Sequence, residues 1–293
     1  MATTAHALPR YRREAMPVWD RVKMPLFYGV LLLWAIVSLT PFWLSVVYSL
    51  MPKENIYDMP PRLLPRPLTL DNYRVVLTSF ELFPRWLLNS TIISAVVTLL
   101  RTLFCAMGGY AFARLKFPGR NILFILMLSS MMIPGQVYIV PNYLTISKVF
   151  HLLDNLLAVI LPGVATAFGI FMMTQFYKSI PAELEEAAFI DGASRFTIFF
   201  RIILPISRAA LITLALFTFQ GTWNEFMWPL IVLQTPENFT LPLGLKWFQS
   251  EYYTLYSIVL SGSLFNSLPI IIIFFLFQRY FIRSVALTGL KEG

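Results

Sequence analysis

Long apolar runs are the feature of this sequence that most limits the folds it can adopt. At a rise of 1.5 Å per residue, about 20 helical residues cross the roughly 30 Å of hydrocarbon in a bilayer. Runs of that length recur six times, so we predict an all-α integral membrane protein with six transmembrane helices. The windows are 26–50, 87–112, 122–143, 152–176, 203–232 and 256–282.

Composition supports a membrane location. Only 13% of the residues are charged and the mean hydropathy is +0.68, whereas soluble domains carry about 25% charged residues. The first window follows a polar leader without a small-residue cleavage site, so we expect it to remain as the first helix. The single cysteine, Cys105, excludes an intrachain disulfide.

The distribution of Lys and Arg predicts the orientation. With the N-terminus inside, fifteen of these residues fall on inner segments and seven on outer segments, so both termini are predicted to be cytoplasmic. Acidic residues divide evenly, and the whole net charge of +8 therefore lies on the inner side. Anionic lipid accounts for that charge, so we expect the lipid bilayer and no nucleic acid as a partner.

The chain divides into a tail and one membrane domain. We assign residues 1–25 to a basic cytoplasmic tail and residues 26–293 to the six-span domain. Within it, the proline-rich segment 52–85 is expected to form an extended extracytoplasmic loop, and 177–202 a cytoplasmic loop.

Two windows contain residues that bear on helix packing. Cys105, Gly109 and Ala113 lie four residues apart, and this small-residue stripe predicts close approach of another helix rather than substrate contact. Pro134 and Pro141 interrupt the third window. A helix broken there either lines a cavity or turns at the surface, and both interpretations remain open.

The cytoplasmic loop concentrates acidic residues in an otherwise apolar chain. "PAELEEAAFIDGASRFTIFFRIILPIS" begins at Pro181, which suits a first helical turn, and Glu183, Glu185 and Glu186 follow there to complement the helix dipole. With Gly192 as a left-handed stop, we predict a helix of about ten residues. Its composition favours either a solvated hairpin or, because it carries paired alanines beside apolar residues, a docking surface.

The same segment resembles a known family motif. "EAAFIDGASRFTIFFRIILP" is similar to the EAA loop of the membrane subunits of binding-protein-dependent ABC importers. The resemblance implies that this helix inserts into a cleft of a cytoplasmic ATPase subunit and transmits its closure to the spans, with Pro205 beginning the fifth span. The ATPase-coupling residues would be Glu186, Ala187, Ala188, Asp191, Gly192, Ile202, Leu204 and Pro205.

The resemblance covers roughly residues 20 to 293. "NSTIISAVVT", "YAFARLKFPG", "MMIPGQVYIVPNY", "FQGTWNEFMWPL" and the terminal "LKEG" resemble the second permease subunit of maltose-type sugar importers. This implies an ABC importer permease fold and import of a di- or oligosaccharide across a bacterial or archaeal cytoplasmic membrane. Ser284, where such subunits commonly have glycine, and Arg101 depart from the pattern.

The resemblance also implies partners. They are a second, homologous permease subunit, two ATPase subunits and an extracytoplasmic sugar-binding protein. ATP and Mg²⁺ would bind to the ATPase, so we expect no cofactor on this chain, no metal site, no catalytic residue and no enzymatic activity of its own.

Charged and amide side chains within the spans are candidates for the translocation path. A charge in hydrocarbon is costly unless it is paired or faces water, so Arg101 and Glu225 either pair, line the path or snorkel separately. "QGTWNEFMWP" combines the flat aromatic and planar polar groups that bind sugars, although Trp228 is equally typical of an interfacial aromatic belt. The candidates are Arg101, Gln220, Trp223, Asn224 and Glu225.

Alternative functions have weaker support. Glycerol phosphate esters or polyols could be carried by the same machinery. An ion-coupled carrier needs titratable carboxylates in the spans, and only Glu225 qualifies. A membrane enzyme needs a convergent catalytic set, but His6 and His151 lie far apart and no G-x-x-x-x-G-K-[ST] or H-E-x-x-H motif occurs in the sequence.

Overall fold

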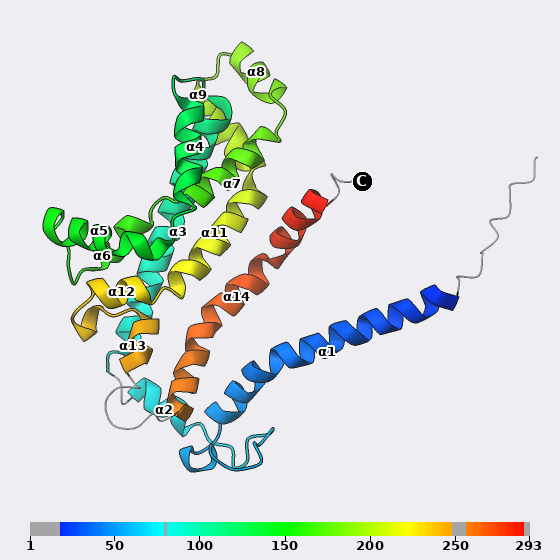
Figure 1. The fold of residues 1–293 in the computed structure, drawn as a ribbon, viewed down its shortest axis with the longest axis vertical. Coiled ribbons are helices and arrows are strands. Elements are labelled where there is room, and N and C mark those ends of the chain that lie inside the picture. Colours follow the sequence, from blue (N-terminus) through cyan, green and yellow to red (C-terminus); the bar gives the residue numbers. More distant parts are fainter. Residues whose placement is uncertain (1–17, 79–80, 248–255, 290–293) are drawn as a thin grey trace, which may run out of the picture.

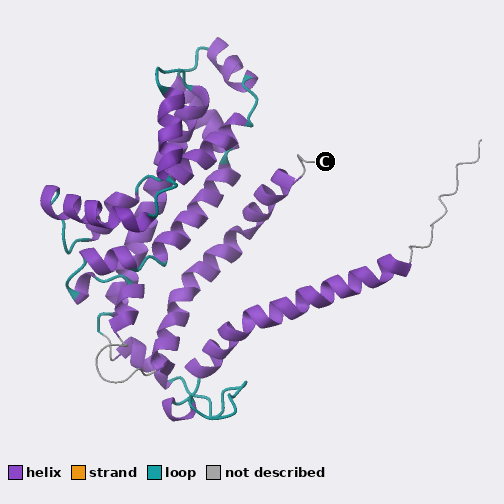
Figure 2. Cartoon of the chain, viewed as in Figure 1, coloured by secondary structure: helices purple, strands orange, loops and turns teal. Residues whose placement is uncertain are grey.

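The protein is a helical bundle with short helices at both of its ends (Figure 1). The structure, a computed structural model, describes residues 18–78, 81–247 and 256–289. No strand occurs among these residues (Figure 2). The longer helices are α1 (Val18–Ser49), α2 (Asp71–Thr78), α3 (Phe83–Arg114), α4 (Arg120–Ser130), α7 (Ala167–Lys178), α8 (Glu183–Ile190), α11 (Arg208–Trp223) and α14 (Tyr256–Gly289).

Short helical segments connect them. The α-helical ones are α5 (Ile139–Leu144), α6 (Leu156–Ile160), α9 (Arg195–Ile198), α10 (Leu204–Ile206), α12 (Met227–Val232) and α13 (Leu241–Trp247). The 3₁₀ turns are η1 (Lys53–Asn55), η2 (Gly135–Tyr138), η4 (Leu161–Gly163) and η6 (Pro236–Asn238), and the π turns are η3 (Thr145–Val149) and η5 (Phe199–Ile203).

The structure has four to six segments that can cross a membrane, compared with the six predicted windows. Four helical segments of the described chain are long and apolar enough to cross a bilayer, and the number is six if each of two bent helix pairs is counted as one span. Helix α1 begins at Val18, so helix extends into residues that the sequence assigned to the tail. The predicted outer loop 52–85 is less extended than expected, because it contains α2 and the first turn of α3.

The third span is broken rather than straight. Helix α4 and the segment Gly135–Val149 meet at 99°. Pro134 lies at the break with an extended backbone conformation, and it has no N–H with which to continue the helical hydrogen bonds. The second half of the predicted window 122–143 therefore turns aside from the bundle, where α5 lies in Figure 1.

The fifth span is bent, which corrects the prediction that Pro205 begins it. The segment Arg195–Ile206, which contains Pro205, meets α11 at 78°, and α11 begins at Arg208. Because Pro205 lacks an N–H, it cannot bond the carbonyl of Arg201, and the π turn η5 occupies the chain just before it. At its other end α11 stops at Trp223, so α12 is a separate helix within the predicted window 203–232.

Close packing of α3 against α7 confirms the role predicted for the small-residue stripe. A Cβ atom added to Gly109 would lie 2.6 Å from the Cβ of Met173, and one added to Gly169 would lie 2.6 Å from the Sγ of Cys105. Both distances are too short for real side chains. Glycine at these two positions is therefore what allows the helix backbones to approach this closely.

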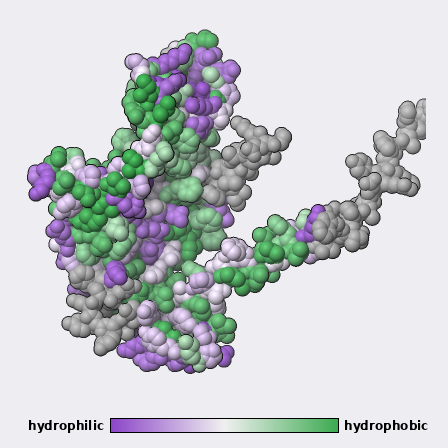
Figure 3. Space-filling view, in the orientation of Figure 1, coloured by the Kyte–Doolittle hydropathy of each residue, from purple (hydrophilic) through white to green (hydrophobic). Residues whose placement is uncertain are grey.

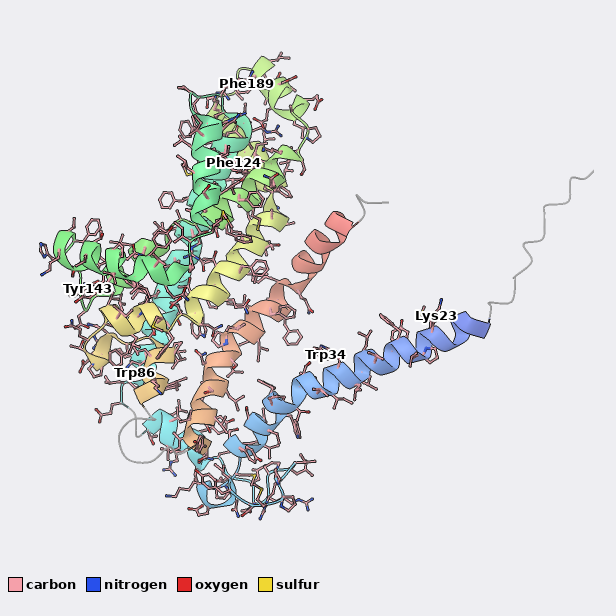
Figure 4. All side chains as sticks on the ribbon, in the orientation of Figure 1. Lys23, Trp34, Trp86, Phe124, Tyr143 and Phe189 are labelled. Carbon is pink, nitrogen blue, oxygen red and sulfur yellow. The ribbon has the colours of Figure 1, made fainter. Side chains whose placement is uncertain are left out.

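Helix α1 stands apart from the bundle along most of its length (Figure 1). Only 6% of its apolar window is buried within the chain. Trp34, for example, lies well away from the other helices in Figure 4 and is 71% exposed. The end of α1 is anchored, because the buried Asn72 amide of α2 donates to the carbonyls of Ser49 and Met51.

Side chains tie the loop after α12 to the bundle at the end of the molecule that holds α2. The indole Nε1 of Trp86 donates to the carbonyl of Pro236 at 2.7 Å. The Asn89 amide donates to the carbonyls of Glu237 and Phe239. These contacts join residues about 150 positions apart in the sequence, so α3 fixes the position of this loop.

Asp154 holds the same loop from another side. Its carboxylate accepts hydrogen bonds from the backbone amides of Gln234 at 2.8 Å and Thr235 at 3.0 Å, and from the Thr235 hydroxyl at 2.9 Å. Burial raises the pKa of the Asp154 carboxyl, but the hydrogen bonds from Thr235 and Gln234 outweigh it, so the pKa lies below its ordinary value.

The lowered pKa predicts a pH dependence for this clamp. Its contribution to stability is complete above the unfolded carboxyl pKa of about 3.9 and is lost as the pH falls through the lower pKa of the folded state. Amide hydrogen exchange at Gln234 and Thr235 should therefore accelerate in that acidic range. In the Asp154→Ala variant, which removes the oxygen that accepts from both amides, the exchange should already be faster at pH 6, and unchanged protection there would refute the clamp.

Candidate functional site

The first candidate site is α8, which lies with α9 at the end of the bundle opposite α2 (Figure 1). Its first turn contains Glu183, Glu185 and Glu186, as the sequence predicts. Pro181 lies before the helix rather than in its first turn, so the helix has eight residues instead of about ten. Gly192 adopts a left-handed φ of +79° and ends the helix as predicted.

The backbone around Gly192 explains why the chain turns sharply there. The amide of Gly192 donates to the carbonyl of Phe189, and the amide of Ala193 donates to the carbonyl of Ala188 at 2.9 Å. This is the paired hydrogen-bond pattern of a Schellman helix ending. Ser194 then caps α9 by accepting from the amide of Thr197, so α8 and α9 are joined by a short, well-defined turn.

A buried ionic cluster attaches α8 to the bundle. The side chain of Glu185 is 8% exposed, and its Oε1 lies 2.8 Å from the Nε of Arg114, which ends α3. Tyr110, one turn earlier on α3, donates its hydroxyl to the other carboxylate oxygen at 2.9 Å. Arg114 also donates from Nη2 to the carbonyl of Ile180, just beyond α7. We call Tyr110, Arg114, Glu185 and the Ile180 carbonyl the anchor cluster.

The anchor cluster was missed from the sequence. In the sequence, Glu185 is one of three acidic residues expected in the first turn of the loop helix. In the structure it points into the protein, and of these three acids only Glu183 and Glu186 are exposed. The signal that could have revealed it is the pair Tyr110 and Arg114. They lie four residues apart and therefore share one face of α3.

The surface of α8 that faces away from the bundle carries apolar and acidic residues together. Ile190 is 87% exposed, and Phe189, at the tip of the molecule in Figure 4, is 40% exposed. The guanidinium of Arg195 lies 5.2 Å from the centre of the Phe189 ring. Hydrophobic and hydrophilic surface are mixed at this end of the space-filling view (Figure 3).

The predicted coupling residues do not all lie on that surface. Glu186, Ala187, Asp191, Gly192 and Pro205 are exposed, and Ile202 and Leu204 are half-buried against the apolar core beneath α8. Ala188 is only 8% exposed and belongs to that core. Its small size therefore serves packing within this chain, whereas Ala187 is open to a partner.

The second candidate site is a cavity of about 300 Å³ between α3, η4, α11 and α12. Arg101 of α3 and Glu225, just beyond α11, both line it. Arg101 donates from Nε to the carbonyl of Gly163, and Glu225 accepts from the amide of Trp228 at 3.2 Å. No ion pair joins Arg101 to Glu225 within the described residues. Of the alternatives left open by the sequence, the geometry favours lining a shared space.

The other three predicted path residues lie elsewhere. Trp223 is 2% exposed, stacks on Phe219 and donates from its indole to the carbonyl of Asn266, so it belongs to the core. Gln220 lines a separate apolar groove between α11 and α14. Asn224 is exposed and approaches the Asn266 amide at 3.5 Å. The sequence did not reveal which side of α11 each of these side chains occupies, because that depends on how α11 packs against the other helices.

Trp228 and Thr222 are cavity residues that sequence reasoning did not select. Trp228 lines the cavity while its indole donates to the carbonyl of Ala158 at 3.0 Å. Across the residues whose positions are given, no group of three or more His, Cys, Asp or Glu side chains could hold a metal ion.

Comparison with known proteins identifies the family. Residues 103–287, more than half of the chain, match the family described as "Binding-protein-dependent transport system inner membrane component". The chain belongs to this family. It is thus a permease, a multi-pass membrane component of a transport system.

Named relatives span nearly the full length of the permease. It is 35% identical to the arabinooligosaccharides transport system permease protein AraQ of Bacillus subtilis, over 92% of this chain and 96% of the relative. It is 30% identical to the probable starch degradation products transport system permease protein AmyC of Thermoanaerobacterium thermosulfurigenes, over 91% and 96%. It is also 30% identical to the sn-glycerol-3-phosphate transport system permease protein UgpE of Escherichia coli, over 88% and 94%.

A solved structure confirms the predicted fold. The permease superimposes on a chain of a bacterial ABC transporter involved in the import of the acidic polysaccharide alginate with a TM-score of 0.80, covering 94% of this chain and 100% of the other. Because the two chains are 24% identical, the likeness establishes the ABC importer permease fold and nothing about the substrate.

Proposed function

We propose that this permease forms half of the translocation path of an ATP-driven importer for a di- or oligosaccharide. Its fold and family are those of ABC importer membrane subunits. The sequence contains no Walker A motif, so ATP and Mg²⁺ bind to partner subunits and no cofactor binds to this chain.

The observation that carries the coupling assignment is the form of α8. It stands beyond the bundle, exposes Glu186, Ala187 and Ile190, and is attached to α3 by the anchor cluster. A helix that exposes apolar and acidic side chains together on its outer surface, and that is held from within by buried contacts, suits insertion into a partner's cleft. The partner is a cytoplasmic ATPase subunit, present in two copies, one for each permease subunit.

The remaining partners follow from the type of system. A second, homologous permease subunit completes the path, and an extracytoplasmic sugar-binding protein delivers the solute. A chain similar to this one, at a TM-score of 0.62, comes from an alginate ABC transporter in complex with an alginate pentasaccharide-bound periplasmic protein. The assembly would lie in the cytoplasmic membrane of a bacterium or archaeon, with both termini inside.

The carbohydrate assignment is supported by the names of the relatives. AraQ and AmyC are named for arabinooligosaccharides and for starch degradation products. UgpE is named for sn-glycerol-3-phosphate, and it keeps glycerol phosphate esters and polyols as the second candidate substrate class. An ion-coupled carrier is disfavoured, because Glu225 is the sole carboxylate it could use and lies exposed at a helix end.

A charge reversal on α8 tests the docking assignment. Glu186→Lys is expected to reduce ATPase co-purification about tenfold or more, because it places a like charge against the basic group that we expect on the partner. Glu54→Lys is the matched control, since it makes the same charge reversal at an exposed glutamate of η1, at the opposite end of the molecule from α8. It should retain ATPase capture. Equal behaviour of the two variants, in stably expressed protein, would contradict the docking surface.

A further inference from the structure

We propose that the cavity between α3, η4, α11 and α12 is a subsite for one neutral glycosyl unit of the transported saccharide. The inference rests on the proposed function and assigns part of the substrate contact to this subunit. The cavity holds about 300 Å³, which is the lower end of the range for small-molecule sites. It is therefore large enough for a single sugar ring and too small for an oligosaccharide.

The first argument is the pair of opposite charges on its walls. Arg101 uses Nε for the Gly163 carbonyl, and within the described residues its terminal nitrogens make no hydrogen bond. Glu225 uses Oε1 for the Trp228 amide, and its other oxygen makes none. Arg101 and Glu225 therefore line the same cavity without forming an ion pair with each other. Their unused nitrogens and oxygen remain available to donate to and accept from a ligand.

These groups match the chemistry of a neutral sugar. Each ring hydroxyl both donates and accepts hydrogen bonds. Neighbouring hydroxyls can therefore accept from the Arg101 guanidinium and donate to the Glu225 carboxylate at the same time. A uronate or phosphate ester would gain from Arg101 but would bring its negative charge near Glu225. The subsite therefore discriminates against anionic units.

The second argument is Gly221, which lies inside α11 and lines the cavity. A Cβ added there would meet no atom within 4 Å, and its φ is not in the left-handed region. Neither close packing nor backbone geometry requires glycine, although glycine weakens a helix interior relative to alanine. The missing side chain instead keeps the cavity open beside Thr222.

Filling the cavity from Gly221 tests the subsite directly. In vesicles that contain the whole importer, Gly221→Phe should reduce ATP-driven uptake at least about tenfold while ATPase co-purification stays unchanged. Gly221→Ala is the matched control, because it adds one methyl group to open space and favours the helix. It should retain uptake to within about twofold. Full uptake by Gly221→Phe would overturn the proposal.

Thiol protection measures occupancy of the cavity in a variant without measuring transport by that variant. The probe is whichever neutral saccharide of a panel that includes arabinotriose and maltotriose drives uptake by the wild-type importer. In detergent-solubilised importer, this saccharide should slow modification of a Thr222→Cys variant by a charged methanethiosulfonate, and trigalacturonate should not. Cys105 is fully buried, so the wild type serves as the unmodified control. Gln234→Cys, on an exposed loop, reports the reactivity of the reagent and should show no protection.

Glu225→Gln completes the experiment. It should weaken protection by the neutral saccharide and reduce discrimination against trigalacturonate, because the like charge is removed. No protection of Thr222→Cys by a saccharide that the wild type transports would overturn the subsite and leave the importer assignment intact. Absence of ATP-driven uptake of every saccharide in the wild type would instead contradict the proposed function.

Discussion

Glu185→Ala is expected to destabilise the permease by about 3–5 kcal/mol, the cost of breaking a buried ion pair by removing one partner. Arg114 would keep its positive charge in a site where it is 15% exposed, with the Ile180 carbonyl as its remaining acceptor. Tyr110 would also lose the acceptor of its hydroxyl. The measurement is thermal or denaturant unfolding of the purified importer in detergent, with the same loss expected for Arg114→Ala.

Two further variants separate the ion pair from general damage to α8. Glu183→Ala removes an exposed carboxylate from the same first turn, and should change stability by less than about 0.5 kcal/mol. The double variant Arg114→Met with Glu185→Leu should recover much of the loss, because apolar replacement of a buried pair is often neutral. A double variant no better than the single ones would mean that the charges themselves are needed.

The anchor cluster also predicts a functional effect at permissive temperature. It joins α8 to the ends of α3 and α7, so movement of α8 by an ATPase should pass to both helices. The recovered double variant retains α8 but replaces directional hydrogen bonds with apolar contact. We expect it to capture ATPase normally and to import fewer solute molecules per ATP hydrolysed. Unaltered stoichiometry would show that the cluster serves stability alone.

Gly244→Ala is expected to produce the second large effect. A Cβ at Gly244 would lie 2.2 Å from two atoms of the Trp86 indole. Trp86 is only 2% exposed and is held by its hydrogen bond to the Pro236 carbonyl, so the ring cannot move aside. Overpacking of this kind costs about 1–3 kcal/mol and occasionally more, and unfolding of the detergent-purified importer would measure it.

Gly221→Ala provides the contrasting substitution. Both glycines lie in helices, where alanine is intrinsically favoured. Gly221 has open space at its Cβ position and Gly244 does not, so the two variants should change stability in opposite directions. Combining Gly244→Ala with Trp86→Leu should cost less than the sum of the single changes. Strict additivity would show that the indole does not oppose the new methyl group.

The membrane-spanning pattern could be predicted because the bilayer imposes it on the sequence. About 20 apolar residues are needed for each crossing whatever the helices later contact. Pro134 marked the break in the third span, because it has no N–H with which to continue the helical hydrogen bonds, whereas the bend after Pro205 was not predicted. The angles of 99° and 78° between the segments come from the structure alone. The window 203–232 likewise did not reveal the separation of α12 from α11.

The candidate sites show a similar division. The position, acidic first turn and glycine ending of α8 follow from local chemistry, and the sequence contains all of them. The direction of each side chain does not. Glu185 and Glu186 are adjacent in the sequence, yet one is buried against Arg114 and the other is exposed.

By itself, the sequence determined that this chain is a multi-span helical membrane protein with an acidic helix between the predicted fourth and fifth spans, because hydropathy and helix capping depend on residues close together in the chain. The tertiary structure alone decided which charges meet. Arg101 and Glu225 line one cavity, and Arg114 reaches Glu185, only after α3 has packed against α7 and α11. Contacts between residues 70 or more positions apart depend on that packing, which no local pattern encodes.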